Sequence, residues 1–440
     1  MRRNLIAIPA LILALALGAC TASGGGDKKG DQAGGGSSKN STAFKADPPL
    51  AFNTVAAVKL PDTALRANLG GEVVSRFTTL RDRTAYIVEP ALLRSVDLLT
   101  GKQKWQLPIA GAPADPNAQH GPFVNNVGPR PPLLSDDGKT VIVAVPVTEP
   151  GAGTTPSHQA ISVLAANSDT GRPKWATKVA VSDAVSGGDG NGAITSVVAA
   201  TDKAVIVTYR NDKATTAAIN PSDQRILWQR DQYEAGTVTG DLVVGIDANV
   251  AENSSMVQAT ALDLVKGDQR WVGAARSSQV TIVPANSALV VVDRADYGSG
   301  DADLLFLDPK TGQQKASYFK DRAFGGGSTL GPCQYDQRSV VVCSPFEGVT
   351  AYDATSGKQL WQLPDKAANR VAPGVTAVWH GAVYGSTSNG PVILDALTGK
   401  DRSASPGAAP HWVSEYGGIG LDPQGAPIAY PARPSPSKTQ

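Results

Sequence analysis

The chain is short of the residues that carry most metal and redox chemistry. Its 440 residues include only three cysteines, four histidines and two methionines. The histidines, at positions 120, 158, 380 and 411, lack the paired spacing of metal ligands. The longest apolar run, from Leu5 to Leu17, is too short to span a bilayer with ease. We expect no metal site and no catalytic residues.

An excess of charge of one sign is also missing. Lysine and arginine number 40, aspartate and glutamate 39, and the net charge is +1. The net charge therefore gives no bulk electrostatic attraction to nucleic acid or to an anionic membrane. The Thr-Gly-Lys triplets at 100–102 and 398–400 lack the rest of a P-loop, and no Gly-x-Ser-x-Gly elbow is present. The acid-rich run 293–303 does not fit an EF-hand.

One short pattern is present seven times. In its clearest copy it is Asp353-Ala354-Thr355-Ser356-Gly357-Lys358-Gln359-Leu360-Trp361, and the copies start at 97, 167, 220, 263, 308, 353 and 395. The last four steps are 43, 45, 45 and 42 residues, the length of one four-stranded propeller blade. Apolar β-rich runs such as 204–209 and 339–342 lie between the copies.

The pattern has a mechanical interpretation. The Asp or Asn ends one strand and accepts backbone N–H groups of the following turn. The Gly supplies the left-handed conformation, and the Trp on the next strand packs against a neighbouring blade. Copies five and seven end in Ala316 and Ser403 instead of Trp, and copy three has Gln224 in place of Gly. The predicted structural residues are Asp97, Gly101, Trp105, Gly171, Trp175, Trp228, Asp263, Gly267, Trp271, Asp308, Gly312, Asp353, Gly357, Trp361, Asp395 and Gly399.

These copies resemble the pyrroloquinoline quinone (PQQ)-like β-propeller repeat, whose hallmark is Ala-Leu-Asp-x-x-Thr-Gly-x-x-x-Trp. Ala261-Leu262-Asp263 and Ala351-Tyr352-Asp353 match its start. The resemblance covers roughly residues 50–430 and implies an all-β propeller of four-stranded antiparallel blades.

Seven blades follow from seven copies, and material remains at both ends. Residues 416–430 form a predicted hairpin that we assign to the first two strands of a blade. Residues 55–61 resemble the outer strand at 103–108. We predict an eighth blade closed by N- and C-terminal strands, because closure removes exposed edges. Seven blades with additional terminal strands is the alternative.

The N-terminus has the features of an export signal. Arg2-Arg3 precede the apolar run, which ends in Leu17-Gly18-Ala19-Cys20 and resembles a bacterial lipobox. The resemblance implies cleavage before Cys20 and attachment of lipid to its thiol; an ordinary signal with a chance cysteine is the alternative. Loss of Arg2 and Arg3 takes the net charge from +1 to −1. We predict a signal peptide at 1–19, a lipidated, Gly/Ser-rich flexible tether at 20–49, the propeller at 50–431 and a disordered tail at 432–440.

The other two cysteines lie close together in sequence. Cys333 and Cys343 belong to one predicted hairpin of blade six, and a disulfide is expected in an exported protein. Two buried free thiols remain the alternative.

Long insertions are predicted to gather on one face of the propeller. They are residues 109–132, 146–160, 180–193, 247–256, 293–303 and 320–331, whereas the turns of the opposite face are short. The first two should be neighbours, and they contain the candidate binding residues His120, Asn125, Asn126, Arg130 and His158. Inert loops are the alternative.

The first functional hypothesis is a non-catalytic, membrane-anchored binding or scaffold protein that presents these loops to an extracytoplasmic protein. The chain resembles PQQ-like propeller lipoproteins, including the propeller subunit of the outer-membrane β-barrel assembly machinery. The second is a sensor of carbohydrate or peptide. The third is a PQQ-dependent dehydrogenase with Ca²⁺; those enzymes usually carry an adjacent Cys-Cys pair, and Cys333 and Cys343 are not adjacent. We therefore expect no cofactor.

The composition resembles that of actinobacterial lipoproteins. This resemblance implies an anchor on the outer face of the cell membrane; in a Gram-negative source we would expect the outer membrane. We expect the protein to be a monomer.

Overall fold

The computed structural model describes residues 43–64, 66–67, 73–74, 77–89, 91–113, 128–186, 193–211, 213–248, 256–283, 288–295, 301–321, 332–344 and 348–435. Contacts divide the chain into Met1–Thr42 and Ala43–Gln440. The first unit, which contains Cys20, lies outside the described residues. Among those that are described, no helix has the length and apolar character needed to cross a membrane.

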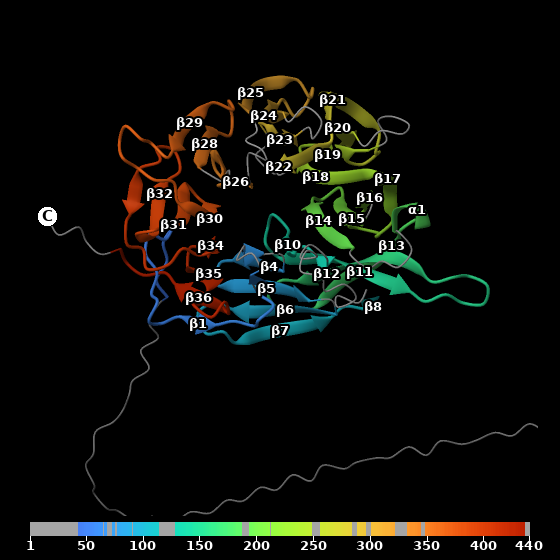
Figure 1. Cartoon of the computed structure of the whole chain (residues 1–440). Helices are drawn as coiled ribbons and strands as arrows, with labels where there is room; N and C mark the ends of the chain where they lie inside the picture. The colour runs from blue at the N-terminus through green and yellow to red at the C-terminus, as the bar shows by residue number, and fades with distance from the viewer. Residues whose placement is uncertain are drawn as a thin grey trace, which may run out of the picture. The chain divides into compact units, whose positions relative to one another are not determined.

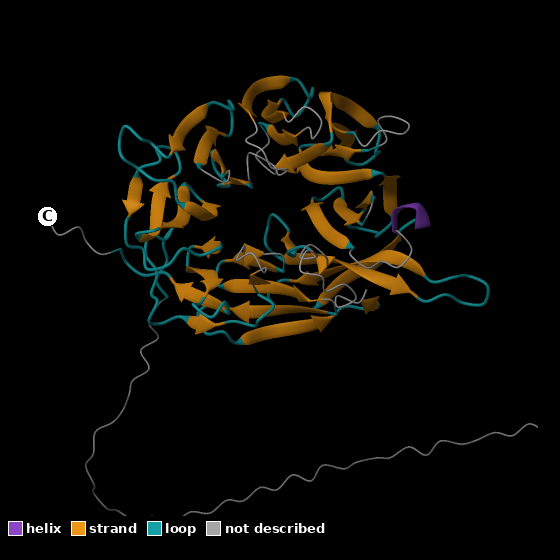
Figure 2. Ribbon diagram, in the orientation of Figure 1, coloured by secondary structure: helices purple, strands orange, loops and turns teal. Residues whose placement is uncertain are grey.

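The second unit is an eight-bladed β-propeller whose blades follow one another around a ring (Figures 1 and 2). Blade 1 contains β4 (Thr78–Arg81), β5 (Thr84–Glu89), β6 (Leu92–Asp97) and β7 (Gln103–Pro108). Blade 2 contains β10 (Leu133–Leu134), β11 (Thr140–Glu149), β12 (His158–Asn167) and β13 (Pro173–Ala180). Blade 3 contains β14 (Ile194–Ala200), β15 (Val205–Arg210), β16 (Ala214–Ile219) and β17 (Ile226–Asp231).

The next four blades repeat the same meander of antiparallel strands. Blade 4 contains β18 (Tyr233–Thr239), β19 (Leu242–Asp247), β20 (Val257–Asp263) and β21 (Gln269–Ser277). Blade 5 contains β22 (Gln279–Val283), β23 (Val290–Ala295), β24 (Asp301–Leu307) and β25 (Gln314–Asp321). Blade 6 contains β26 (Cys333–Tyr335), β27 (Val340–Cys343), β28 (Val349–Asp353) and β29 (Gln359–Leu363). Blade 7 contains β30 (Gly374–Trp379), β31 (Ala382–Thr387), β32 (Gly390–Asp395) and β33 (Asp401–Ser403).

Blade 8 joins the two ends of the propeller and confirms the predicted eight blades. Its strand order is β1 (Val58–Lys59), β36 (Pro427–Pro431), β35 (Gly417–Leu421) and β34 (Trp412–Ser414). Val58 pairs with Ala429, so the N-terminal segment supplies the outer strand. The hairpin assigned to strands one and two is strands two and three, because β34 precedes it; that part of the prediction was wrong. Ala432, the first residue of the predicted tail, still bridges to Phe52.

Four small elements lie outside the blade cores. They are the hairpin β2 (Arg66–Ala67) and β3 (Val73–Val74), the strands β8 (Ala112–Pro113) and β9 (Gly128–Pro129), and the helical turn α1 (Asp183–Ser186).

The nine-residue pattern forms the turn between the third and fourth strands of a blade, as predicted. In blade 6 the Asp353 carboxylate accepts the backbone N–H groups of Thr355 and Ser356, at 3.2 and 2.7 Å. Gly357 adopts a φ of +70° and donates its N–H to the Asp353 carbonyl at 2.8 Å. In blade 3 Gln224 adopts a φ of +61° in place of Gly, so the turn survives the substitution.

Four of the tryptophans each join one blade to the next. The indole N–H donates to the carbonyl of the residue that follows the Asp or Asn of the neighbouring turn. The pairs are Trp105 with Ser168 (2.9 Å), Trp228 with Leu264 (3.0 Å), Trp271 with Pro309 (2.8 Å) and Trp361 with Ala396 (2.7 Å). The ring lies over the turn glycine: a Cβ on Gly171 would come within 2.6 Å of Trp105.

Other side chains take this place where tryptophan is missing. Between blades 5 and 6, Phe306 lies under Gly357, and the Tyr318 hydroxyl donates to the Gly357 carbonyl at 2.8 Å. In blade 8, Val58 lies under Gly101. Several different side chains can therefore pack against the turn glycine of the next blade.

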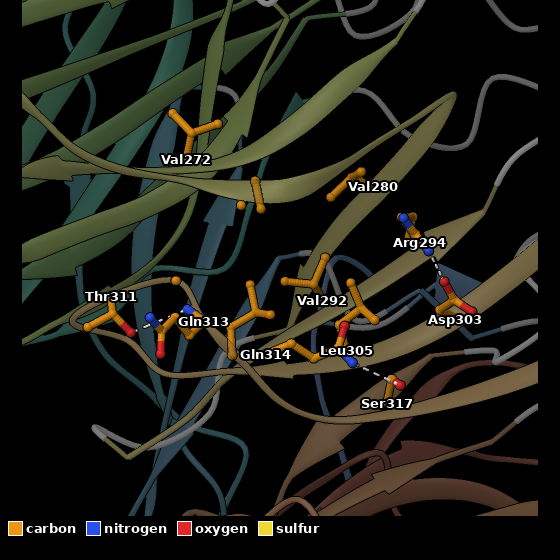
Figure 3. A pocket seen from close by; sticks show the side chains of 14 residues that line it. Val272, Val280, Val292, Arg294, Asp303, Leu305, Thr311, Gln313, Gln314 and Ser317 are labelled. Carbon is orange, nitrogen blue, oxygen red and sulfur yellow. Dashed lines mark hydrogen bonds and ion pairs between the residues drawn. The ribbon is translucent and has the colours of Figure 1, made fainter.

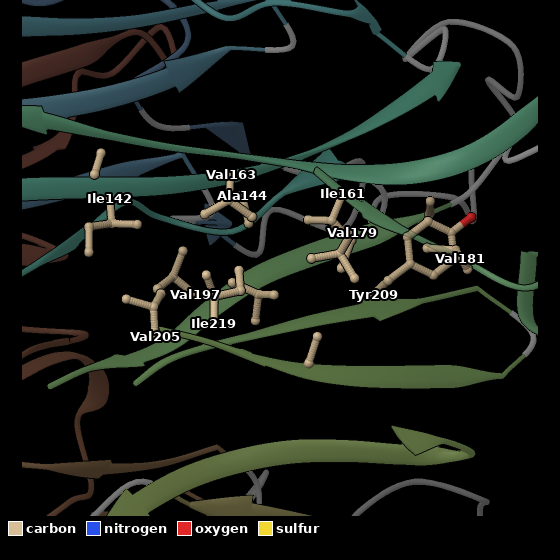
Figure 4. Packing of buried hydrophobic residues seen from close by; sticks show 14 of the residues in the cluster. Ile142, Ala144, Ile161, Val163, Val179, Val181, Val197, Val205, Tyr209 and Ile219 are labelled. Carbon is tan, nitrogen blue, oxygen red and sulfur yellow. The ribbon is translucent and has the colours of Figure 1, made fainter. Parts of the chain in front are cut away.

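The core is a series of layers between adjacent blades. Between blades 2 and 3, Ile161 and Val179 share one layer with Ile219 (Figure 4). Val207 belongs to the same layer, and all four side chains are fully buried. Burial of such a side chain contributes roughly 1.5–3 kcal/mol. Because each layer is small, the ring can grow without a single large core.

The disulfide predicted in blade 6 is present. Cys333 of β26 lies directly opposite Cys343 of β27, with Cα atoms 4.0 Å apart and sulfur atoms 2.00 Å apart. It joins the inner two strands of that blade.

Candidate functional site: the face with the long insertions

The two faces of the propeller differ in their connections. In each blade the turns between strands one and two and between strands three and four lie on one face, because consecutive strands are antiparallel. The links between blades and the loops between strands two and three lie on the other. The described ends of all six predicted insertions lie on this second face, which we call the insertion face.

The first two insertions are neighbours, as expected. β8, from the 109–132 insertion, pairs with β11 through Ala112 opposite Thr148 and Pro113 opposite Val147. The chain then reaches the inner side of blade 3, where β9 pairs in parallel with β14. The described ends of this insertion thus add to the second strand of blade 2 and to the innermost strand of blade 3.

The 146–160 insertion is a β-hairpin arm and not an irregular loop. The ladder between β11 and β12 continues without interruption as far as Glu149 opposite His158. Residues 150–157 form its exposed tip, which projects from the ring in green (Figure 1). The Lys178 ammonium of β13 contacts Glu149 at 2.6 Å and braces its base. The arm therefore has a defined direction.

The candidate residues are not brought together as one cluster. His158 is exposed at the base of the arm. His120, Asn125 and Asn126 lie outside the described residues. Arg130 is described: its backbone N–H donates to the Thr195 carbonyl at 2.7 Å, and its side chain is half-buried.

Arg130 belongs to a small charged cluster with Arg210 and Glu234. Arg210 Nε lies 3.3 Å from Glu234 Oε1. Burial, and then the positive charge of Arg210, lower the pKa of Arg130, while Glu234 raises it. Two guanidinium groups facing one carboxylate leave an excess of positive charge, which suits an anionic group.

Sequence reasoning missed Arg210 and Glu234. Arg210 ends the second strand of blade 3, and Glu234 is the second residue of blade 4. Both strand ends lie on the insertion face in a four-stranded blade, so the blade register would have placed them together. The charge of these two residues did not single them out, because 18% of the residues in the chain are charged.

More polar contacts surround the outer strand of blade 3 on the same face. Arg230 pairs with Asp247 at 2.5 Å and lies over the ring of Tyr233. The Ser182 hydroxyl, just before α1, donates to Asp231 at 2.8 Å. Blades 3 and 4 are linked by the single residue Gln232, so no long connection between them covers these charged groups.

The remaining insertions are partly described. The 180–193 insertion contains α1; residues 249–255, 296–300 and 322–331 lie outside the described residues. Within the described part of the chain no group of three or more His, Cys, Asp or Glu side chains is placed to hold a metal. In the acid-rich run 293–303, Asp303 instead contacts Arg294.

A family model of PQQ-like repeats, described as outer membrane protein assembly factor BamB, matches residues 158–330 and 320–429. The chain belongs to this family. The match covers more than half of the chain and agrees with the repeat identified from the Asp-to-Trp pattern. Members of the PQQ-like propeller family share the blade repeat that the structure shows here.

Solved structures resemble this PQQ-like propeller in fold. The computationally designed Ika8 protein superposes with a TM-score of 0.50 at 14% identity, covering 87% of this chain and 99% of its own. A europium-containing methanol dehydrogenase gives 0.47 at 13% identity, covering 84% of each chain. BamB from Moraxella catarrhalis gives 0.42 at 14% identity, covering 77% of this chain and 94% of its own. No curated protein matches the chain.

Proposed function

We propose that the protein is a lipid-anchored, extracytoplasmic and non-catalytic scaffold that binds a protein partner through its insertion face. The observation that carries this proposal is the β11–β12 arm, a continuous β-hairpin that extends from the propeller on the face where the insertions gather. Binding residues are commonly displayed on such projections from a stable framework.

The N-terminal segment packs against the face opposite the insertions. Asp47 contacts His380 and Arg338, both at 2.6 Å, and Lys45 contacts Glu415 at 3.2 Å. These three partners lie in turns between strands one and two, on the face opposite the insertions. The described chain therefore starts on the short-turn face, and this segment leaves the insertion face uncovered.

The anchor itself is tested at Cys20. In the source cells, the wild-type chain should fractionate with the membrane, and Cys20→Ala should not be retained there. A Cys20→Ala protein that stays in the membrane fraction would contradict lipid anchoring.

The partner is tested by site-specific photo-crosslinking in those cells. A benzoylphenylalanine residue at Thr154, on the tip of the arm, should give a reproducible protein adduct. The matched control is the same residue at Lys203, which is equally exposed but lies in the short turn between β14 and β15. Adducts from both positions, or from neither, contradict the proposed scaffold. The BamB description of the family makes an envelope assembly component the first partner to look for.

The Arg130 cluster favours a second candidate, a sensor of peptides or acidic carbohydrates. A peptide carboxylate could bind between Arg130 and Arg210 in a site that is already partly desolvated. Glycan and peptide arrays would then give hits that Arg130→Gln weakens by roughly tenfold, the loss of one charge-assisted hydrogen bond. Arrays without such hits leave the scaffold as the function.

The absence of catalysis is part of the proposal and has its own test. Addition of PQQ and Ca²⁺ should produce no bound-quinone absorption and no alcohol-dependent dye reduction. Either signal would make the protein a quinoprotein enzyme.

A further inference from the structure

A cavity of about 400 Å³ lies between blades 4 and 5 (Figure 3). Its middle is apolar and is formed by Val280, Val292 and Leu305, with the partly exposed Val272 at its mouth. This volume is in the range of small-molecule sites, which are mostly apolar with a few polar groups.

Polar side chains lie at both ends of the cavity. Arg294 and Asp303 pair with each other at one end, in view of the apolar middle (Figure 3). Thr311 and Gln313 lie at the other end, and Gln314 Nε2 donates to Ser317 Oγ at 3.1 Å beside Leu305 (Figure 3). The apolar body and polar ends together define an amphipathic lining.

The cavity exists because blade 4 has small residues where other blades have large ones. Two residues beyond the docking tryptophan, blade 1 has Leu107 opposite Leu93, and blade 6 has Leu363 opposite Val349. These leucines and valines pack in the core between blades. At the same position of blade 4 stands Gly273, whose nearest neighbour across the strands is Ala259.

The outer strand also bulges at this point. β20 and β21 are in register at Thr260 opposite Val272, and the register has shifted by Gln258 opposite Arg276. The side-chain amide of Gln258 donates to the Gly273 carbonyl, so the bulge has its own hydrogen bond. Bulges are typically found where a strand is re-aimed beside a functional site.

We infer that this cavity is a binding site for a small, uncharged organic molecule with an apolar body and one hydrogen-bonding end group. The size and the apolar lining select the body. Arg294 and Asp303 already neutralise each other, so they favour a neutral group such as a carbonyl or hydroxyl over a charged one, which would break the pair. The Arg294–Asp303 end of the cavity belongs to the 293–303 insertion, but binding of a small molecule between blades 4 and 5 does not depend on the scaffold role.

Fluorescence titration of the full propeller tests the inference with 6-propionyl-2-dimethylaminonaphthalene, a neutral naphthyl ketone. It should bind with one-to-one stoichiometry and a blue-shifted emission. Gly273→Leu, which puts the leucine of blades 1 and 6 into the cavity, should weaken binding by roughly tenfold or more, because overfilled sites exclude ligand.

Two further variants keep the result clear. Ala259→Val fills the cavity from the opposite strand with the residue of blade 6, so it should also weaken binding if Gly273→Leu does not fold. Thr177→Leu places the same leucine two residues after Trp175 in blade 2, away from the cavity, and should bind as the wild type does. Absence of binding by the wild-type protein, or equal binding by the filled variants, would overturn the site. Tighter binding of the anionic 1-anilinonaphthalene-8-sulfonate would overturn the assignment of an uncharged ligand.

Discussion

At the residue scale, the contact between a glycine and a tryptophan is the unit from which the propeller is assembled. Gly312 has a φ of +69°, and a Cβ there would lie 2.5 Å from the ring of Trp271. The glycine is therefore required twice, once for its backbone conformation and once for the close approach of the indole.

These two requirements can be separated by experiment. Gly312→Ala should lower the free energy of unfolding by roughly 2–4 kcal/mol, because it adds a steric clash to the backbone strain. The matched control is Gly240→Ala in blade 4, where φ is +58° and nothing lies within 4 Å of the added Cβ. The control should cost only about 1 kcal/mol, the strain alone. Urea denaturation measures both, and equal losses would show that the tryptophan contact contributes nothing.

At the element scale, the disulfide joins two short inner strands of blade 6. β26 has three residues and β27 four, and the bond closes a loop with a sequence separation of 10 residues. The double variant Cys333→Ala, Cys343→Ala should be less stable than the wild type by about 2–3 kcal/mol, from the lost restriction of the unfolded chain. A reductant should destabilise the wild type equally and leave the variant unchanged in urea denaturation. A reductant effect on the variant would assign the loss to something other than this bond.

The start of β34 predicts a pH dependence for blade 8. Burial lowers the pKa of His411 from 6.5 to about 4, and its backbone N–H donates to the Ile419 carbonyl at 2.7 Å. The unfolded chain binds a proton on this side chain below about pH 6.5, while the folded chain does so only near pH 4. Stability contributed by this group is therefore complete above pH 6.5 and is lost as the pH falls toward 4, by up to about 3 kcal/mol.

The variant His411→Gln isolates that contribution. It removes the titrating group. The difference in unfolding free energy between wild type and variant should therefore change between pH 7 and pH 4, and it should stay constant below pH 4. Denaturation curves at several pH values give this difference. A difference that does not vary with pH would contradict a buried, neutral His411.

Regular elements were easier to predict than the irregular ones that make the sites. The turns and outer strands carry the Asp, Gly and Trp pattern, so their positions follow directly from the sequence. β34 was missed because three residues after Pro410 show no alternation of apolar and polar residues. The β11–β12 arm was predicted as a loop because Pro146, Gly151 and Gly153 interrupt its sequence. The ladder nevertheless includes Pro146, opposite Ile161, and the two glycines lie in the tip. The cavity depends on Gly273, which is significant only once blades are superposed by strand register.

At the scale of the whole molecule, the ring is closed by a strand that comes from the other end of the chain. β1 contributes two residues to blade 8, and the segment before it buries Phe52 completely against Tyr384 and its neighbours. The Tyr384 hydroxyl donates to the Pro49 carbonyl at 3.0 Å. Residues 46–59 therefore hold blades 7 and 8 together from outside their own meander.

Two truncations test whether this closure carries the stability of the ring. Removal of residues 1–42 leaves every described contact of the second unit in place, so the thermal midpoint should stay within about 2 °C of the full chain. Removal of residues 1–61 takes away β1 and Phe52 and leaves β36 with an unpaired edge. Loss of that buried phenylalanine alone corresponds to about 3–5 kcal/mol, and the open edge invites pairing with a second molecule. The shorter chain should therefore melt at a much lower temperature and form oligomers in light scattering, whereas a monomer with an unchanged midpoint would mean that the ring holds without its closing strand.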